Sequence, residues 1–118
     1  MFKITGSEFG KVIINGNEIT HDFIATNGGI EKRNKEVSRK HKAKYGHTPL
    51  TPEENIPWHC KNIIIGTGFY EGLPISPDFM MEAEKRGIQI LVMDTPSALL
   101  MLEMNEDPET GFIIHLTC

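Results

Sequence analysis

A strand–helix–strand pattern between residues 63 and 93 constrains the fold more than any other feature of the sequence. The run Ile63–Ile65 is apolar on both faces, which is typical of a central strand covered on both sides. A helix begins at Ser76-Pro77 and ends at Gly87, and the next strand occupies residues 88–93. Such a unit predicts two parallel, neighbouring strands joined by a right-handed crossover.

Further elements lie on both sides of this unit. Thr95 and Pro96 predict the start of a helix over residues 95–105, and a last strand is expected at 112–117. Near the N-terminus, Asn15-Gly16 separates two β-prone runs, at 9–14 and 18–26, and is a strong hairpin signal.

These elements together define the expected fold class. Residues 18–26 alternate so that Ile19, His21, Phe23 and Ala25 share one face, which predicts that this face is buried and the other mostly polar. We therefore expect an α/β protein, a single layered domain over residues 1–118. It has a mixed sheet, with an N-terminal β-hairpin followed by a βαβαβ portion.

The segment 31–47 is strongly basic. Its span Lys32–Lys44 holds seven of the 12 Lys and Arg residues and only one acid, so the charge of that span is near +6 while the rest of the chain is near −10. Such an asymmetry is typical either of an anionic partner or of a solvated loop. Because the segment lacks an apolar stripe, we interpret it as an exposed, mobile loop within the domain. After it, Thr51, Pro52 and Glu54 form a capping box that predicts a short helix.

Composition excludes several protein classes. The chain has no apolar run near the ~20 residues of a membrane helix, and its first residues lack the apolar core of a signal peptide. Its two cysteines, Cys60 and Cys118, do not form a disulfide-rich pattern, so we expect free thiols and a cytoplasmic location. The only aromatic residue of the basic segment is Tyr45, which disfavours a nucleic-acid partner.

Candidate functional residues follow the two parallel strands. Gly66-Thr67-Gly68 ends one strand and Asp94-Thr95 ends the other, and ligands of α/β sheets bind beyond such ends. We call these residues the rim, and we expect its glycine N–H groups and Asp94 to contact a ligand. Alternatively, the glycines only allow a sharp turn, and Asp94 and Thr95 only cap a helix.

The histidines and cysteines provide weaker candidates. His47 and Asp94 are candidate catalytic residues, whereas His115 and Cys118 lie three apart on a strand and so point to opposite faces. The five histidines form no pair at the spacing of metal ligands, so we expect no metal site and no cofactor.

Several sequence phrases resemble a known family. They are FGKVIING-NEITHDFI, GH-TPLTPEE at 46–54, IIIGTG at 63–68, GIQILVMDTPSAL at 87–99 and HLTC at 115–118. Together they are similar to the Mth-type domain family, which includes small prokaryotic proteins of unknown function, an adipogenesis-associated protein and a mitochondrial complex I assembly factor. The resemblance implies a layered α/β fold around a mixed sheet. It implies no reaction.

Two hypotheses of function follow. The preferred one is a non-enzymatic binding or assembly module whose rim holds a partner protein or a small anionic ligand. The other is a small-molecule enzyme that uses Asp94, Thr67 and His47 at the same rim. An enzyme requires at least two of these polar groups to converge on one cleft, whereas a binding module requires only an exposed patch.

Overall fold

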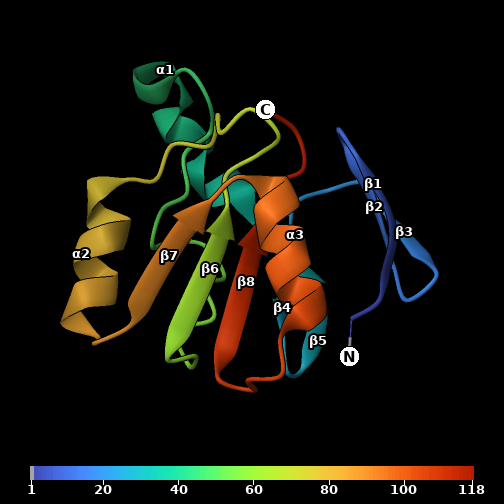
Figure 1. Cartoon of the computed structure of the whole chain (residues 1–118). Coiled ribbons are helices and arrows are strands. Elements are labelled where there is room, and N and C mark those ends of the chain that lie inside the picture. Colours follow the sequence, from blue (N-terminus) through green and yellow to red (C-terminus); the bar gives the residue numbers. More distant parts are fainter. Residues whose placement is uncertain (1) are drawn as a thin grey trace.

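The computed structural model describes residues 2–118, which form two β-sheets with flanking helices (Figure 1). The strands are β1 (Ile4–Glu8), β2 (Lys11–Ile14), β3 (Asn17–Ile19), β4 (Phe23–Thr26), β5 (Gly29–Lys32), β6 (Asn62–Gly66), β7 (Gln89–Met93) and β8 (Thr110–Ile114). The helices are the 3-10 helix η1 (Lys35–His41) and the α-helices α1 (Lys42–Tyr45), α2 (Pro77–Lys85) and α3 (Thr95–Met104).

The larger sheet is mixed, as the sequence predicts. Its five strands lie in the order β5-β4-β8-β6-β7, and β6 pairs in parallel with both β7 and β8. β4 is antiparallel to both β8 and β5. The predicted parallel pairing of the strands that contain residues 63–66 and 88–93 is therefore confirmed.

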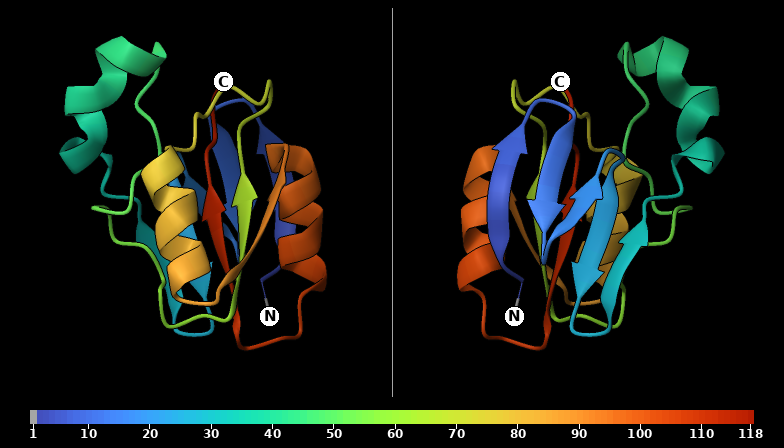
Figure 2. Two further views of the ribbon diagram at one scale, coloured as in Figure 1. Left: turned by 90° about the vertical axis from the view of Figure 1, so that its left-hand side faces the viewer. Right: turned by 90° about the vertical axis from the view of Figure 1, so that its right-hand side faces the viewer.

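The molecule has three layers, with the five-stranded sheet in the middle (Figure 2). On one face, α3 and the antiparallel sheet β1-β2-β3 cover a core that contains Ile14, Leu102 and Phe112. On the other face, α2 covers a second core through Phe79 and Ala83. Both faces of β6 are thus buried, which explains its wholly apolar sequence.

The run 18–26 is not one strand, and this corrects the sequence interpretation. The hairpin at Asn15-Gly16 is confirmed, with positive φ angles of 52° and 81°, but β3 ends at Ile19. The chain then crosses to the other sheet, where β4 begins at Phe23. Asp22 and Ile24 were expected on a polar face but are buried, because β4 lies inside the five-stranded sheet.

The basic segment also differs from the expected loop. It contains the end of β5, then η1 and α1, and both Arg33 and Ser38 are buried. The interpretation as a solvated loop is wrong for Arg33, which is 3% exposed. The mobility of the segment stays a prediction. The short helix predicted at Thr51 is a turn. The Glu54 side chain accepts the Thr51 N–H at 3.3 Å, as in a capping box, and also binds Arg33.

No helix within residues 2–118 has the length and apolar character that crossing a bilayer requires.

Candidate functional site

The structure brings the two parts of the rim together. Because β6 and β7 are parallel neighbours, Gly66–Gly68 and Asp94–Thr95 follow them at the same end of the sheet, beyond the carboxyl ends of the two strands. The Gly68 N–H donates to Thr95 Oγ1 at 2.8 Å, and the Thr95 N–H donates to the Gly68 carbonyl at 3.0 Å. The two loops are therefore hydrogen-bonded to each other, and Gly66–Gly68 and Thr95 are buried.

The polar side chains of the rim are hydrogen-bonded to backbone groups of other residues. The Thr67 hydroxyl donates to the Met93 carbonyl at 3.1 Å. The Asp94 carboxylate accepts the Ser97 N–H at 2.8 Å, so Asp94 is the N-cap of α3. The predicted helix start had Thr95 as its N-cap, and capping by Asp94 was the alternative to a ligand-binding role. This hydrogen bond from the Ser97 backbone lowers the pKa of Asp94, which makes the carboxylate a weaker base.

The last four residues, 115–118, pack directly against the rim. The His115 N–H donates to the Gly66 carbonyl at 2.9 Å, and the Gly72 N–H donates to the Cys118 carbonyl at 2.7 Å. Gly68 has a φ of +112°, and a Cβ there would lie 2.3 Å from the carbonyl carbon of Cys118. Glycine is thus required at position 68 by both backbone conformation and close packing. A role in ligand binding stays a prediction.

His47 does not join this arrangement. It is exposed after α1, and within residues 2–118 its side chain makes no hydrogen bond to Thr67 or Asp94. Cys60 is buried, and burial raises the pKa of its thiol, whereas Cys118 is half-buried. The two cysteines are not bonded to each other.

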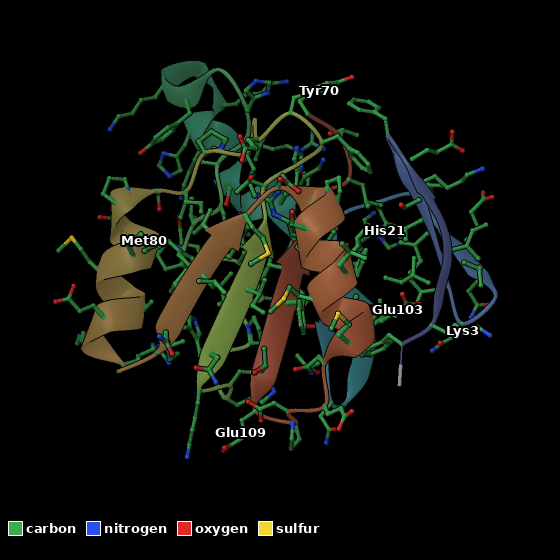
Figure 3. All side chains as sticks on the ribbon, viewed as in Figure 1. Lys3, His21, Tyr70, Met80, Glu103 and Glu109 are labelled. Atoms are coloured by element: carbon green, nitrogen blue, oxygen red, sulfur yellow. The ribbon has the colours of Figure 1, made fainter. Side chains whose placement is uncertain are left out.

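An aromatic cluster lies beside the rim, and the sequence reasoning missed it. The ring of Phe9, from the β1–β2 turn, lies 6.2 Å from the ring of Phe69 and 5.9 Å from that of Tyr70. Tyr70 is 77% exposed and Phe9 is 50% exposed, at the end of the molecule where Figure 3 labels Tyr70. The available signal was two adjacent aromatic residues after Gly68, in a stretch without strand or helix periodicity.

A buried ion-pair cluster lies on the other side of His115. The Arg33 guanidinium donates to both oxygens of Glu54, at 2.6 and 3.0 Å, and to Asp22 at 2.9 Å. Its remaining contact is the Pro49 carbonyl at 3.0 Å. Glu54 also accepts from the Ser38 hydroxyl. We call Asp22, Arg33, Glu54 and His115 the ion-pair cluster.

His115 connects this cluster to the rim. Its Nδ1 lies 2.7 Å from Asp22, while its carbonyl accepts the Thr95 hydroxyl. Burial favours a higher pKa for Asp22. The hydrogen bond and charge of His115, the Leu116 N–H and the Arg33 charge outweigh burial and lower this pKa to about 2. Every buried polar side-chain atom among the described residues has a partner, so the cluster is satisfied within the chain.

A hollow elsewhere gives no comparable site. It has a volume of about 460 Å³ between the β4–β5 hairpin and residues 55–59. Its Asn55 amide is already bonded to the Lys32 carbonyl and to Glu31. Residues 2–118 contain no group of three or more His, Cys, Asp or Glu side chains arranged to hold a metal ion.

Comparison with known proteins assigns the chain to a family. The model of the family described as "Protein of unknown function (DUF498/DUF598)" matches residues 4–103. The chain belongs to this family. The resemblance to the Mth-type domain family is thereby confirmed. No curated protein matches.

Solved structures of similar proteins support this membership. A conserved hypothetical protein, PH1505 from Pyrococcus horikoshii OT3, is 34% identical, with a TM-score of 0.82 over 98% of this chain and 99% of that chain. The protein MT938 is 24% identical, with a TM-score of 0.72 over the whole of both chains. An outer membrane protein from Bartonella henselae shares the fold at 13% identity, with a TM-score of 0.65 over 98% of this chain and 94% of that chain. None of these descriptions names an enzymatic activity.

Proposed function

We propose that the chain is a non-enzymatic binding module whose rim docks a partner protein through the aromatic cluster Phe9, Phe69 and Tyr70. The observation that carries this proposal is the exposure of Tyr70 (77%) and Phe9 (50%) beside the rim. Exposed aromatic side chains supply much of the binding energy of protein interfaces. The rim backbone behind them is fixed by Gly68, Thr95 and the last four residues, which provides a rigid base.

The geometry favours a partner protein over a small anionic ligand. An anion would have to approach the N–H groups of Gly66–Gly68. The Thr67 N–H donates to the Met93 carbonyl, the Gly68 N–H to Thr95, and the last four residues cover the loop. A partner protein requires no such access because it can contact the aromatic side chains that project from the surface.

The geometry also disfavours the enzyme hypothesis. Thr67 and Asp94 are each turned toward a backbone group, and His47 lies on a separate segment. Catalysis by these residues would need them to converge on one reacting atom.

The test is native capture with matched variants. The wild-type chain, Tyr70→Ala and Met104→Ala would each be immobilised and exposed to a lysate of the source cells. Met104 is 76% exposed at the far end of α3, so it controls for the loss of an exposed apolar side chain. We expect a protein that wild type and Met104→Ala retain equally, and that Tyr70→Ala retains at least ~10-fold less.

Two results would contradict the proposal. One is a retained protein that Tyr70→Ala binds as well as wild type does. The other is a substrate whose turnover falls ~100-fold in Asp94→Asn, which would support the enzyme hypothesis instead.

A further inference from the structure

β7 leaves one side of its backbone unpaired. It is the last strand of the five-stranded sheet and pairs with β6 in unbroken register, from Asn62↔Gln89 to Gly66↔Met93. Within residues 2–118 no strand pairs with its other side. Figure 2 (left) shows this edge uncovered between α2 and α3. The free N–H and C=O groups of such an edge are a template for another strand.

The chemistry of this edge differs from that of the other edges. β7 has the sequence Gln-Ile-Leu-Val-Met, without charge, proline or glycine, and Leu91 and Val92 are each 48% exposed. The other edge strands that the structure describes carry charged residues: Glu8 on β1, Glu18 on β3, and Glu31 and Lys32 on β5. Charges on an edge oppose pairing with another molecule, so β7 is the edge without this protection.

Apolar side chains flank β7 on both faces. Leu91 is in register with Ile64, which belongs to the core beneath α3, so Leu91 lies on the α3 face. On α3, Met101 lies about 200° around the helix from Glu103, whose carboxylate accepts the Ile4 N–H of β1. Met101 therefore faces away from the three-stranded sheet and is 41% exposed. On the opposite face, α2 carries Met80, also 41% exposed (Figure 3).

We propose that β7 pairs antiparallel with β7 of a second copy of this chain, about a twofold axis at Leu91. The two five-stranded sheets then form one continuous sheet. In this register Leu91 faces Leu91 of the second copy, and Ile90 faces Val92, so β-branched and aliphatic side chains meet across the axis. The axis is perpendicular to the sheet, so it places α3 beside α3 and brings the Met101 side chains of the two copies to the same face.

Charge favours the antiparallel direction. Lys85 and Arg86, at the C-terminal end of α2, lie four and three positions before β7, and Asp94 immediately follows β7. Antiparallel pairing places the basic end of one copy beside the acidic end of the other. Parallel pairing would place like charges together.

A hollow beside β7 fits the same register. It has a volume of about 220 Å³ and is lined by Ile64, Gln89 and Leu91, together with Asn62, Ile63 and Thr110. Met93 of the second copy lies directly opposite Gln89, at the margin of this hollow. The pairing thus covers an apolar surface that a single copy leaves open.

Sedimentation velocity from about 1 μM to about 1 mM tests the proposal. We expect the wild-type chain to form a dimer as concentration rises. Leu91→Lys and Leu91→Glu each weaken association at least ~10-fold, because position 91 faces itself and like charges then meet. An equimolar mixture of the two variants regains the dimer, since the lysine introduced in one variant then meets the glutamate introduced in the other.

Two controls keep the result specific. Circular dichroism checks that each variant is folded, and Tyr70→Ala, at the rim, leaves the dimer intact. This control also separates the dimer from the proposed function, which depends on Tyr70 and not on Leu91. If the charged variants fail to fold, hydrogen exchange of the wild-type β7 amides replaces them, and we expect protection that rises with protein concentration.

The proposal is overturned if the wild-type chain stays monomeric over the whole concentration range. A chain whose β7 pairs only with a strand of a different protein would give this result. The proposal is equally overturned by folded Leu91→Lys that dimerises as well as wild type, or by β7 amides whose protection does not depend on concentration.

Discussion

Arg33 is held by two carboxylates and a carbonyl oxygen, while lysines close to it in the sequence face solvent. Its side chain is 1% exposed, and the Glu54 carboxylate binds it through two parallel hydrogen bonds. Lys42 and Lys44, on α1, are exposed. A buried ion pair that loses one partner leaves an uncompensated charge, whereas an exposed lysine leaves none.

Arg33→Gln is therefore expected to lower the free energy of unfolding by about 3–5 kcal/mol, because Asp22 and Glu54 would stay buried without their cation. Lys42→Gln, which removes the same charge from the same basic segment, should change it by less than ~0.5 kcal/mol. Urea denaturation of the two variants measures both values. Equal effects would mean that Arg33 is not buried as described.

The sequence did not reveal this role because the partners of Arg33 are distant along the chain. Asp22 is 11 positions away and Glu54 is 21 positions away. The charge pattern of a basic run does not distinguish one buried arginine from its exposed basic neighbours. Asp22 was missed for the first of these reasons: its partner Arg33 is distant along the chain, and the alternating pattern placed Asp22 on the polar face.

At the scale of elements, a short apolar run and the residues that begin and end helices predicted the strand–helix–strand unit and the helix after it. The strands β6 and β7 and the helices α2 and α3 were found within one or two residues of their observed bounds. β1 and β5 were missed because Ile-Thr-Gly-Ser-Glu and Gly-Ile-Glu-Lys are short and mostly polar. The crossing at Thr20–Asp22 was missed because alternation continues through it while the chain changes sheets.

In the loop after β6, Gly68 allows residues 115–118 to pack closely against the backbone. Gly68→Ala should lower the free energy of unfolding by more than ~2 kcal/mol, because the new Cβ would lie 2.3 Å from the Cys118 carbonyl carbon at a φ of +112°. Gly28→Ala is the matched control, since its Cβ would meet only Thr26 Oγ1 at 3.6 Å. Thermal unfolding of both variants measures the difference. A Gly68→Ala variant as stable as Gly28→Ala would show that the last four residues do not pack on the loop.

At the scale of the whole molecule, the ion-pair cluster joins regions that are far apart in the sequence. Asp22 lies before β4, Arg33 follows β5, Glu54 lies before β6, and His115 follows β8. The Leu116 N–H adds a further bond to Asp22 at 2.9 Å. The stability of the whole domain should therefore depend on the ionisation of Asp22.

The pKa of Asp22 is lowered from 3.8 to about 2 in the folded chain, so the folded state favours its ionised form. This contributes about 2 kcal/mol of stability above pH 3.8, which is lost as the pH falls toward 2. Asp22→Asn should be less stable than wild type at neutral pH, and the two should differ less as the pH falls through this range. Denaturation curves from pH 7 to about pH 2 test this. A difference between the two chains that does not change with pH would contradict the expectation.

The packing of residues 115–118 against Gly68 also determines where attached peptides leave the molecule. Cys118 lies at the end that carries the aromatic cluster, whereas the described chain begins at the opposite end (Figure 1). Any fusion peptide or surface linker joined after Cys118 emerges beside Tyr70 and competes for the space in which a partner would bind. Chains for the capture experiment should accordingly be immobilised through the N-terminal end.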